Sequence, residues 1–200
     1  MMANELSLGT AQWGMDYGIT NLNGKVLESE VSQILSTAFS HGYHWLDTAQ
    51  GYGNAEKVIG KLNMGRFKII NKIDSQQKKV FFEQDKEYWN KEINKTLDNL
   101  QRDYIDILLL HSADDLKKEG ARYLEDWLVE LRDAGKARKI GISIYEAEDL
   151  NGINEAILDV VQLPLSIYDQ RAIHNRTIDR LNDKGIDVHV RSIYTQGLLL

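Results

Sequence analysis

The sequence predicts an α/β fold in which parallel strands alternate with helices. Two observations lead to this prediction: short apolar runs alternate with helical apolar patterns from end to end, and no linker or low-complexity tract interrupts them. Strands that return in the same direction need a crossover helix between them, as this order provides. Because 200 residues with 42% hydrophobic content can bury one sizeable core, a single domain over residues 1–200 is expected.

Seven short runs rich in apolar residues are the candidate strands. They are LSLG from residue 6, HWLD from 44, FKII from 67, YIDILLL from 104, KIGI from 139, DVVQL from 159 and DVHV from 187. The lone proline, Pro164, sits just past the sixth run, where a missing amide donor costs little.

Six segments carry apolar residues at the i, i+3, i+4 spacing of a helix face. They cover residues 29–41, 55–62, 89–100, 124–131, 145–156 and 171–184, the last two with weaker patterns. Gly42, Gly135 and Gly185 supply C-terminal stops for three of them.

Charge and composition exclude several classes of function. With 24 Lys and Arg against 30 Asp and Glu, the net charge is −6, which disfavours nucleic acid and anionic membranes as partners. There are no cysteines for disulfides or thiolate metal sites. His41 and His44 straddle a predicted helix end, so no metal site is assigned. Without a signal peptide pattern or a membrane-length apolar run, cytoplasmic localisation is expected.

Two architectures compete for this alternating pattern, an open doubly wound sheet and a closed barrel. The open sheet usually binds a dinucleotide through a glycine-rich turn after its first strand. Here that turn reads GTAQWGMD, which has neither G-x-G-x-x-G nor the lysine of a P-loop. The prediction is therefore a TIM (β/α)8-type barrel, which carries its reactive side chains just after the strands.

Four ionisable residues follow consecutive predicted strands. They are Asp47 at the end of the second, Tyr52 in the loop behind it, Lys72 at the third and His111 at the fourth. A tyrosine with an ordinary pKa of about 10 is a poor acid at neutral pH unless a cation such as Lys72 stabilises the phenolate. Asp47 would hold the lysine, and His111 would donate a hydrogen bond to a substrate oxygen. The group suits protonation of a carbonyl oxygen as hydride reaches its carbon.

Each of these residues taken alone has an ordinary explanation: a turn aspartate, a loop aromatic, a solvated lysine and a rim histidine. Their joint occurrence carries the functional hypothesis. A Schiff-base aldolase or isomerase that uses Lys72 is a competing hypothesis, but it leaves Asp47 and Tyr52 unexplained at their spacing.

Three motifs in order, DTAQGYGNAEKVIG, IINKID and DILLLHS, resemble the aldo-keto reductase family, and the resemblance runs to the last residues. It implies a barrel that uses NADPH, or alternatively NADH, to reduce a small-molecule aldehyde or ketone. It also implies that Tyr52 is the proton donor, with Asp47, Lys72 and His111 completing a catalytic tetrad. By the same resemblance, Ser143 and Gln162 hold the nicotinamide carboxamide. Residues along the cofactor pyrophosphate would be Ser192, Gln196, Gly197 and Leu198.

Two positions depart from the family pattern. Ile144 stands where many members have an asparagine, which removes one expected carboxamide contact. Arg191 stands where many members stack an aromatic ring on the nicotinamide, and an arginine plane can stack there instead.

The sequence ends just after the seventh predicted strand, so the barrel is expected to be truncated at its carboxyl end. Strands one and seven would then have open edges, which are sites for self-association. The alternative to an active reductase is a non-catalytic reductase-like module, or a fragment, that binds cofactor or a partner without turnover. In the family, the part beyond strand seven carries the main grip on the adenosine end of the cofactor.

Overall fold

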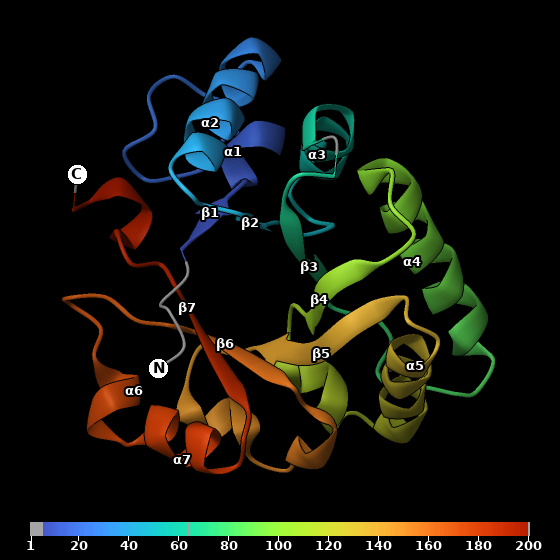
Figure 1. Cartoon of the computed structure of the whole chain (residues 1–200). Helices are drawn as coiled ribbons and strands as arrows, with labels where there is room; N and C mark the ends of the chain where they lie inside the picture. Colours follow the sequence, from blue (N-terminus) through green and yellow to red (C-terminus); the bar gives the residue numbers. More distant parts are fainter. Residues whose placement is uncertain (1–5, 64, 200) are drawn as a thin grey trace.

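The computed structural model describes residues 6–63 and 65–199 and has seven parallel strands in one curved sheet (Figure 1). The strands are β1 (Ser7–Gly9), β2 (Trp45–Asp47), β3 (Lys68–Ile73), β4 (Ile105–Leu110), β5 (Ala137–Ser143), β6 (Val160–Pro164) and β7 (Asp187–Arg191). All seven predicted strands are confirmed. The sheet order is β1 to β7 without a reversal, which is the winding of a barrel and not of a doubly wound sheet.

Helices cover the outer face of this sheet (Figure 1). The α-helices are α1 (Ala11–Gly14), α2 (Glu28–Ser40), α3 (Ala55–Asn63), α4 (Asp85–Leu100), α5 (Ala121–Asp133), α6 (Arg171–His174) and α7 (Thr177–Asp183). Short 3-10 helices are η1 (Ala113–Lys117), η2 (Ala147–Leu150), η3 (Glu155–Ile157) and η4 (Thr195–Gly197). The four strongly patterned helices are confirmed as α2, α3, α4 and α5.

The two weaker helix predictions are wrong in their continuity. Residues 145–156 form η2 and η3, separated by extended Asn151 and by Gly152 at a φ of +77°. The Asp149 carboxylate accepts from the amides of residues 145 and 146, which is one half of a capping box that starts η2 at this point. Residues 171–184 divide into α6 and α7 at Arg176, whose φ is 58°. Asn175 Oδ1 accepts from the Thr177 amide and starts the second helix.

The main hydrophobic core lies between the sheet and the helices, and a smaller one fills the inside of the barrel. Ile69 and Ile73 of β3 belong to the outer core, whereas Ile70 belongs to the inner cluster with Ile107 and Leu109. Strand side chains alternate between faces, so Lys72 shares the inner face with Ile70. The sheet therefore directs a lysine into the barrel at the carboxyl end of β3.

The sheet remains open between β1 and β7. Each of these strands pairs on one side only within the described residues, β1 with β2 and β7 with β6. The loop after β7 returns to the β1 side, where Gly197 lies so close to Thr20 that a Cβ on the glycine would collide with Thr20 Oγ1. The carboxyl ends of all seven strands thus border one mouth.

Candidate active site

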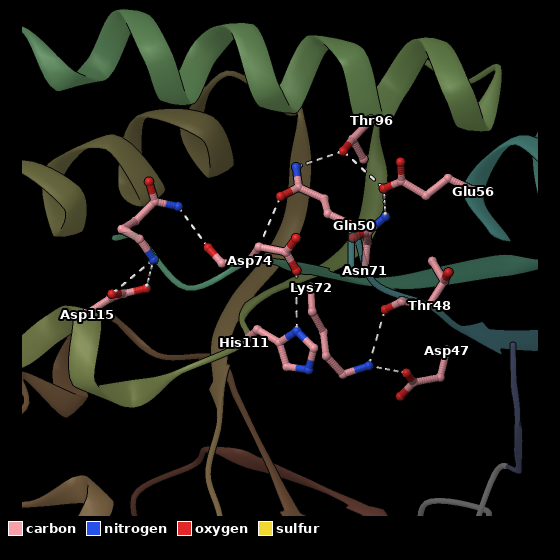
Figure 2. A network of polar contacts seen from close by, with 11 residues as sticks. Asp47, Thr48, Gln50, Glu56, Asn71, Lys72, Asp74, Thr96, His111 and Asp115 are labelled. Carbon is pink, nitrogen blue, oxygen red and sulfur yellow. Dashed lines mark hydrogen bonds and ion pairs between the residues drawn. The ribbon is translucent and has the colours of Figure 1, made fainter. Parts of the chain in front are cut away.

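An ion pair lies inside the mouth, between Lys72 of β3 and Asp47 of β2 (Figure 2). The Lys72 side chain is 2% exposed and its ammonium group donates to Asp47 Oδ1 and, at 3.2 Å, to the Thr48 carbonyl oxygen. The other carboxylate oxygen of Asp47 accepts from Gln162 Nε2 of β6 at 2.5 Å. Burying a charge is tolerated when it is paired and hydrogen-bonded, and Asp47 meets both conditions.

Tyr52 lies above this pair in a turn that glycines permit. Its ring centroid is 5.5 Å from Lys72 Nζ and 6.0 Å from the centroid of the His111 ring, which stands nearly perpendicular to it. Gly53 has a φ of +58°, and a Cβ there would collide with the Gly14 carbonyl oxygen. The structure thus brings together the four predicted residues, Asp47, Tyr52, Lys72 and His111.

The Tyr52 phenol keeps its proton in this environment. Burial raises its pKa well above the ordinary value, and the Asp47 carboxylate raises the pKa further. The Arg191 guanidinium acts in the opposite direction and lowers it. The sequence argument assigned the lowering to Lys72, whose charge is paired here with Asp47. It named Arg191 only for stacking on the nicotinamide and did not anticipate its effect on the Tyr52 pKa.

His111 is held by a residue that the sequence analysis missed, Asp74 (Figure 2). The His111 amide donates to the Ile73 carbonyl oxygen at 2.9 Å, and its Nδ1 lies 3.6 Å from Asp74 Oδ1. The Asp74 amide donates to Gln50 Oε1 at 3.1 Å. A Cβ on Gly51 would lie 2.7 Å from Asp74 Oδ1, so the turn before Tyr52 leaves room for this carboxylate. The sequence did contain a signal for Asp74, because a residue two positions after Lys72 lies on the same face of an extended chain.

A second polar network fixes α3 and α4 on the outer face of β3 (Figure 2). Glu56 accepts from Asn71 Nδ2 at 2.8 Å, from Thr96 Oγ1 at 3.1 Å and from Asn99 Nδ2 at 2.9 Å. Gln50 Nε2 donates to the same Thr96 hydroxyl at 2.9 Å. Because Gln50 also contacts the Asp74 amide, this outer network supports the segment that carries His111's partner.

Ser143, the last residue of β5, pairs in register with Gln162 in the middle of β6, and both side chains are buried. Gln162 Oε1 has no hydrogen-bond partner among the described residues, although the atom is buried. A buried carbonyl oxygen without a donor is costly, and a ligand amide at this place would satisfy it. Ile144, which follows Ser143, is 1% exposed and packs in the outer core. Its side chain therefore makes no polar contact in the mouth.

The predicted pyrophosphate residues lie in the loop after β7, at the same rim as Gln162. Ser192 and Gln196 have φ values of 61° and 56°, and Thr195 has 50°. Three residues with side chains in the left-handed region store backbone strain, which is often found at functional sites. Gly197 belongs to η4, and Leu198 follows it with its side chain exposed. That Ser192, Gln196, Gly197 and Leu198 contact a cofactor stays a prediction.

Among residues 6–63 and 65–199, no group of three or more His, Asp or Glu side chains is arranged to hold a metal ion. No helix in the same part of the chain is long and apolar enough to cross a bilayer.

Comparison with known proteins decides the family. The sequence model of the aldo/keto reductase family matches residues 5–200. The chain belongs to this family. It is 28% identical to the aldo-keto reductase YhdN of Bacillus subtilis, over 98% of this chain and 60% of that protein. It is also 28% identical to the NADH-specific methylglyoxal reductase of Escherichia coli, over 96% and 64% of the two chains.

A solved structure shows the same arrangement of strands and helices. The holo form of an aldo-keto reductase from Bacillus halodurans superposes with a TM-score of 0.71 at 26% identity, over 98% of this chain and 64% of that one. The chain thus spans somewhat less than two thirds of the length of these relatives.

Proposed function

We propose that this aldo-keto reductase reduces an aldehyde or ketone to an alcohol, using a nicotinamide dinucleotide as the hydride source and Tyr52 as the proton donor. The observation that carries the proposal is the buried Asp47–Lys72 pair beneath the Tyr52 and His111 rings. The reductase activities of relatives at 28% identity support it.

The four residues divide the work of proton transfer. The Tyr52 hydroxyl gives its proton to the carbonyl oxygen, and the His111 imidazole donates a hydrogen bond to that oxygen and orients it. Tyr52 holds its proton firmly before reaction, so it releases the proton only as negative charge develops on the substrate. Lys72 then stabilises the phenolate, and Asp47 keeps the ammonium group in place.

The cofactor, NADPH or NADH, would supply hydride at the end of the mouth near Gln162. The unpartnered Gln162 Oε1 fits the amide donor of a nicotinamide carboxamide, and the Ser143 side chain lies in register beside it. The strained loop of residues 192–198 would bind the pyrophosphate through the amides of Ser192 and Gln196, both at positive φ, because such turns direct backbone N–H groups toward anions. The amides of Thr195, Gly197 and Leu198 donate within the loop.

The experiment that tests this proposal is a titration of the 200-residue chain with NADPH and with NADH, followed by tryptophan fluorescence. Saturable micromolar binding and turnover of simple aldehydes are expected, and the cofactor with the lower Kd is assigned. Absence of binding to either would contradict the proposal.

A second candidate is a non-catalytic module that binds cofactor or another copy of this chain through its open edges. The single-sided pairing of β1 and β7 favours it. Analytical ultracentrifugation together with the titration separates the two, because this candidate predicts a dimer that binds nucleotide without turnover. A Schiff-base mechanism at Lys72 requires a neutral amine, whereas this amine pairs with Asp47. Failure of borohydride to trap a carbonyl compound on Lys72 would exclude that mechanism.

A further inference from the structure

Arg191, the last residue of β7, reaches across the mouth toward β5. Its main chain pairs with the end of β6, where Leu165 N donates to the Arg191 carbonyl oxygen at 3.1 Å. Its side chain donates from Nη2 to the Ile144 carbonyl oxygen at 3.1 Å, and the guanidinium carbon lies 4.3 Å from the centroid of the Tyr145 ring. The guanidinium therefore lies over the end of β6, on the side of the mouth that contains Gln162.

The charge of Arg191 is not neutralised by the described part of the chain. Its hydrogen-bond acceptors are the Ile144 carbonyl oxygen and the Ser192 hydroxyl, both uncharged, and no carboxylate among residues 6–63 and 65–199 forms an ion pair with it. Six other arginines have carboxylate partners: Arg102, Arg132, Arg138, Arg171, Arg176 and Arg180. Arg66 and Arg122 have none, but both are exposed to water.

Arg191 differs from Arg66 and Arg122 because it is half-buried. Guanidinium groups have five N–H donors in a planar fork, and two hydrogen bonds leave several of these donors for a ligand. In a protein with a net charge of −6, acidic side chains are abundant, yet none occupies this position. A half-buried cation with free donors is the usual receptor for carboxylate and phosphate groups.

The guanidinium is connected to the reacting centre through Ile144 and Gln162, because the Ile144 amide donates to the Gln162 carbonyl oxygen at 2.8 Å and Gln162 Nε2 donates to Asp47. Arg191 lowers the pKa of the Tyr52 phenol, and Tyr145, on which the guanidinium lies, also acts on that phenol. The acidic group nearest to this chemistry, Asp47, is already paired with Lys72 and bonded to Gln162. A molecule whose carbonyl oxygen contacts Tyr52 would therefore present its neighbouring atoms to Arg191.

We propose that Arg191 binds an anionic group of the substrate, so that the enzyme prefers carbonyl compounds that carry a carboxylate or a phosphate. This inference rests on the proposed reductase function. The Tyr145 ring and the Ile144 carbonyl oxygen hold the guanidinium plane in place before substrate binds, which reduces the entropy lost when the fork closes on an anion.

The test compares matched substrates that differ in charge. At saturating cofactor, kcat/KM is measured for 4-oxobutanoate against butanal and for glyceraldehyde 3-phosphate against glyceraldehyde, and the pair with the larger difference identifies the anion. For Arg191→Gln, the value for the anionic partner is expected to fall about 10- to 100-fold, the loss expected for hydrogen bonds to a charged group. The value for the neutral partner should fall by a smaller factor, because Arg191 also lowers the pKa of the Tyr52 phenol, so the ratio of the two values is the quantity that reports the anion site. The Kd of the cofactor should change little.

Two further variants separate charge from shape. Arg191→Lys keeps the charge without the planar fork and should retain part of the preference. Arg66→Gln removes an equal charge at an exposed position and should change nothing. An equal fall in kcat/KM for charged and neutral substrates in Arg191→Gln would overturn the inference. It would assign Arg191 to stacking on the nicotinamide. A higher Kd of the cofactor in Arg191→Gln, together with an unchanged preference for anionic substrates, would also overturn the inference. Arg191 would then bind the phosphates of the cofactor.

Failure of the reductase function is distinguishable from failure of this inference. If the wild-type chain reduces none of the four compounds, the proposed function fails, and calorimetric titration with 4-oxobutanoate and with glyceraldehyde 3-phosphate tests the anion site alone. Binding that Arg191→Gln abolishes supports the site, and absence of binding to the wild-type chain refutes it. Circular dichroism checks that each variant is folded.

Discussion

The two sides of the barrel mouth are built differently. On the β2 to β4 side, charged groups have partners: Lys72 is paired with Asp47, and His111 lies against Asp74. On the β5 to β7 side, within residues 6–63 and 65–199, Gln162 Oε1 has no partner and Arg191 has no carboxylate, and the loop that follows has three non-glycine residues at positive φ. Two buried oxygens near the first side, Thr48 Oγ1 and Asn71 Oδ1, also lack a partner in this part of the chain, but both are uncharged. Figure 2 shows two groups of contacts on the first side, one that joins Lys72 to Asp47 and Thr48 and one that runs from His111 through Asp74 and Gln50 to Thr96.

This difference assigns a role to each side. Groups that stabilise charge in a transition state work best when they are already in position, because reorganisation then costs nothing during the reaction. Groups that bind a ligand are completed by that ligand, so they are unsatisfied without it. The β2 to β4 side therefore fits proton transfer, and the β5 to β7 side fits binding of the cofactor and of the rest of the substrate.

The largest effect is expected from Tyr52→Phe, which removes the proton donor and keeps the ring. Turnover of a carbonyl substrate should fall by about 10²- to 10⁴-fold, the usual contribution of a general acid. Nucleotide affinity should stay within about twofold, because the Tyr52 hydroxyl lies on the proton-transfer side of the mouth. Its removal should therefore cost the nucleotide less than the free energy of one hydrogen bond. Steady-state kinetics and fluorescence titration measure the two quantities, and turnover equal to wild type would assign the proton donor elsewhere.

The next largest effect concerns the buried ion pair. Lys72→Met leaves the Asp47 carboxylate without its cation, so the free energy of unfolding should fall by about 3 kcal/mol. The double variant Lys72→Met with Asp47→Asn removes both charges and should recover part of that loss. Urea denaturation measures both. A single variant as stable as the wild type would show that Gln162 and solvent suffice to hold Asp47.

Much of this mouth follows from local sequence. Strands were predictable because runs such as YIDILLL are apolar throughout, and their carboxyl ends place Asp47, Lys72 and His111 on one rim. The position of Arg191 was predictable in the same way. Its contacts were not, because its hydrogen bond to Ile144 joins residues 47 positions apart. The break in residues 145–156 at Asn151 and Gly152 was missed because apolar periodicity does not report the positive φ that Gly152 adopts.

On the ligand-binding side, Gln162→Met tests whether the unpartnered oxygen is reserved for the cofactor. The variant loses the acceptor, so the Kd of the nucleotide should rise about tenfold, which corresponds to one buried hydrogen bond. The melting temperature should change little, because removal of an unsatisfied carbonyl offsets the lost hydrogen bond to Asp47. Ser143→Ala is the matched variant at the neighbouring strand. An unchanged Kd would assign Gln162 to the support of Asp47 alone.

The smallest effect is expected at Asp74, which contacts His111 from outside the reacting group. Asp74→Asn keeps the size of the side chain but removes the charge that favours a proton on His111 Nδ1, so turnover should fall only about 3- to 10-fold. Asp114→Asn, an exposed carboxylate paired with Lys117, is the control and should have no effect. Imidazole ¹⁵N shifts of His111 separate positioning from general destabilisation, because the Nδ1 shift should change in Asp74→Asn, where the carboxylate beside Nδ1 is lost, and should stay as in the wild type in Asp114→Asn. An unchanged Nδ1 shift in Asp74→Asn would mean that Asp74 leaves the orientation of His111 to the main-chain bond with Ile73, and that the proton-transfer side is less completely organised than the distances indicate.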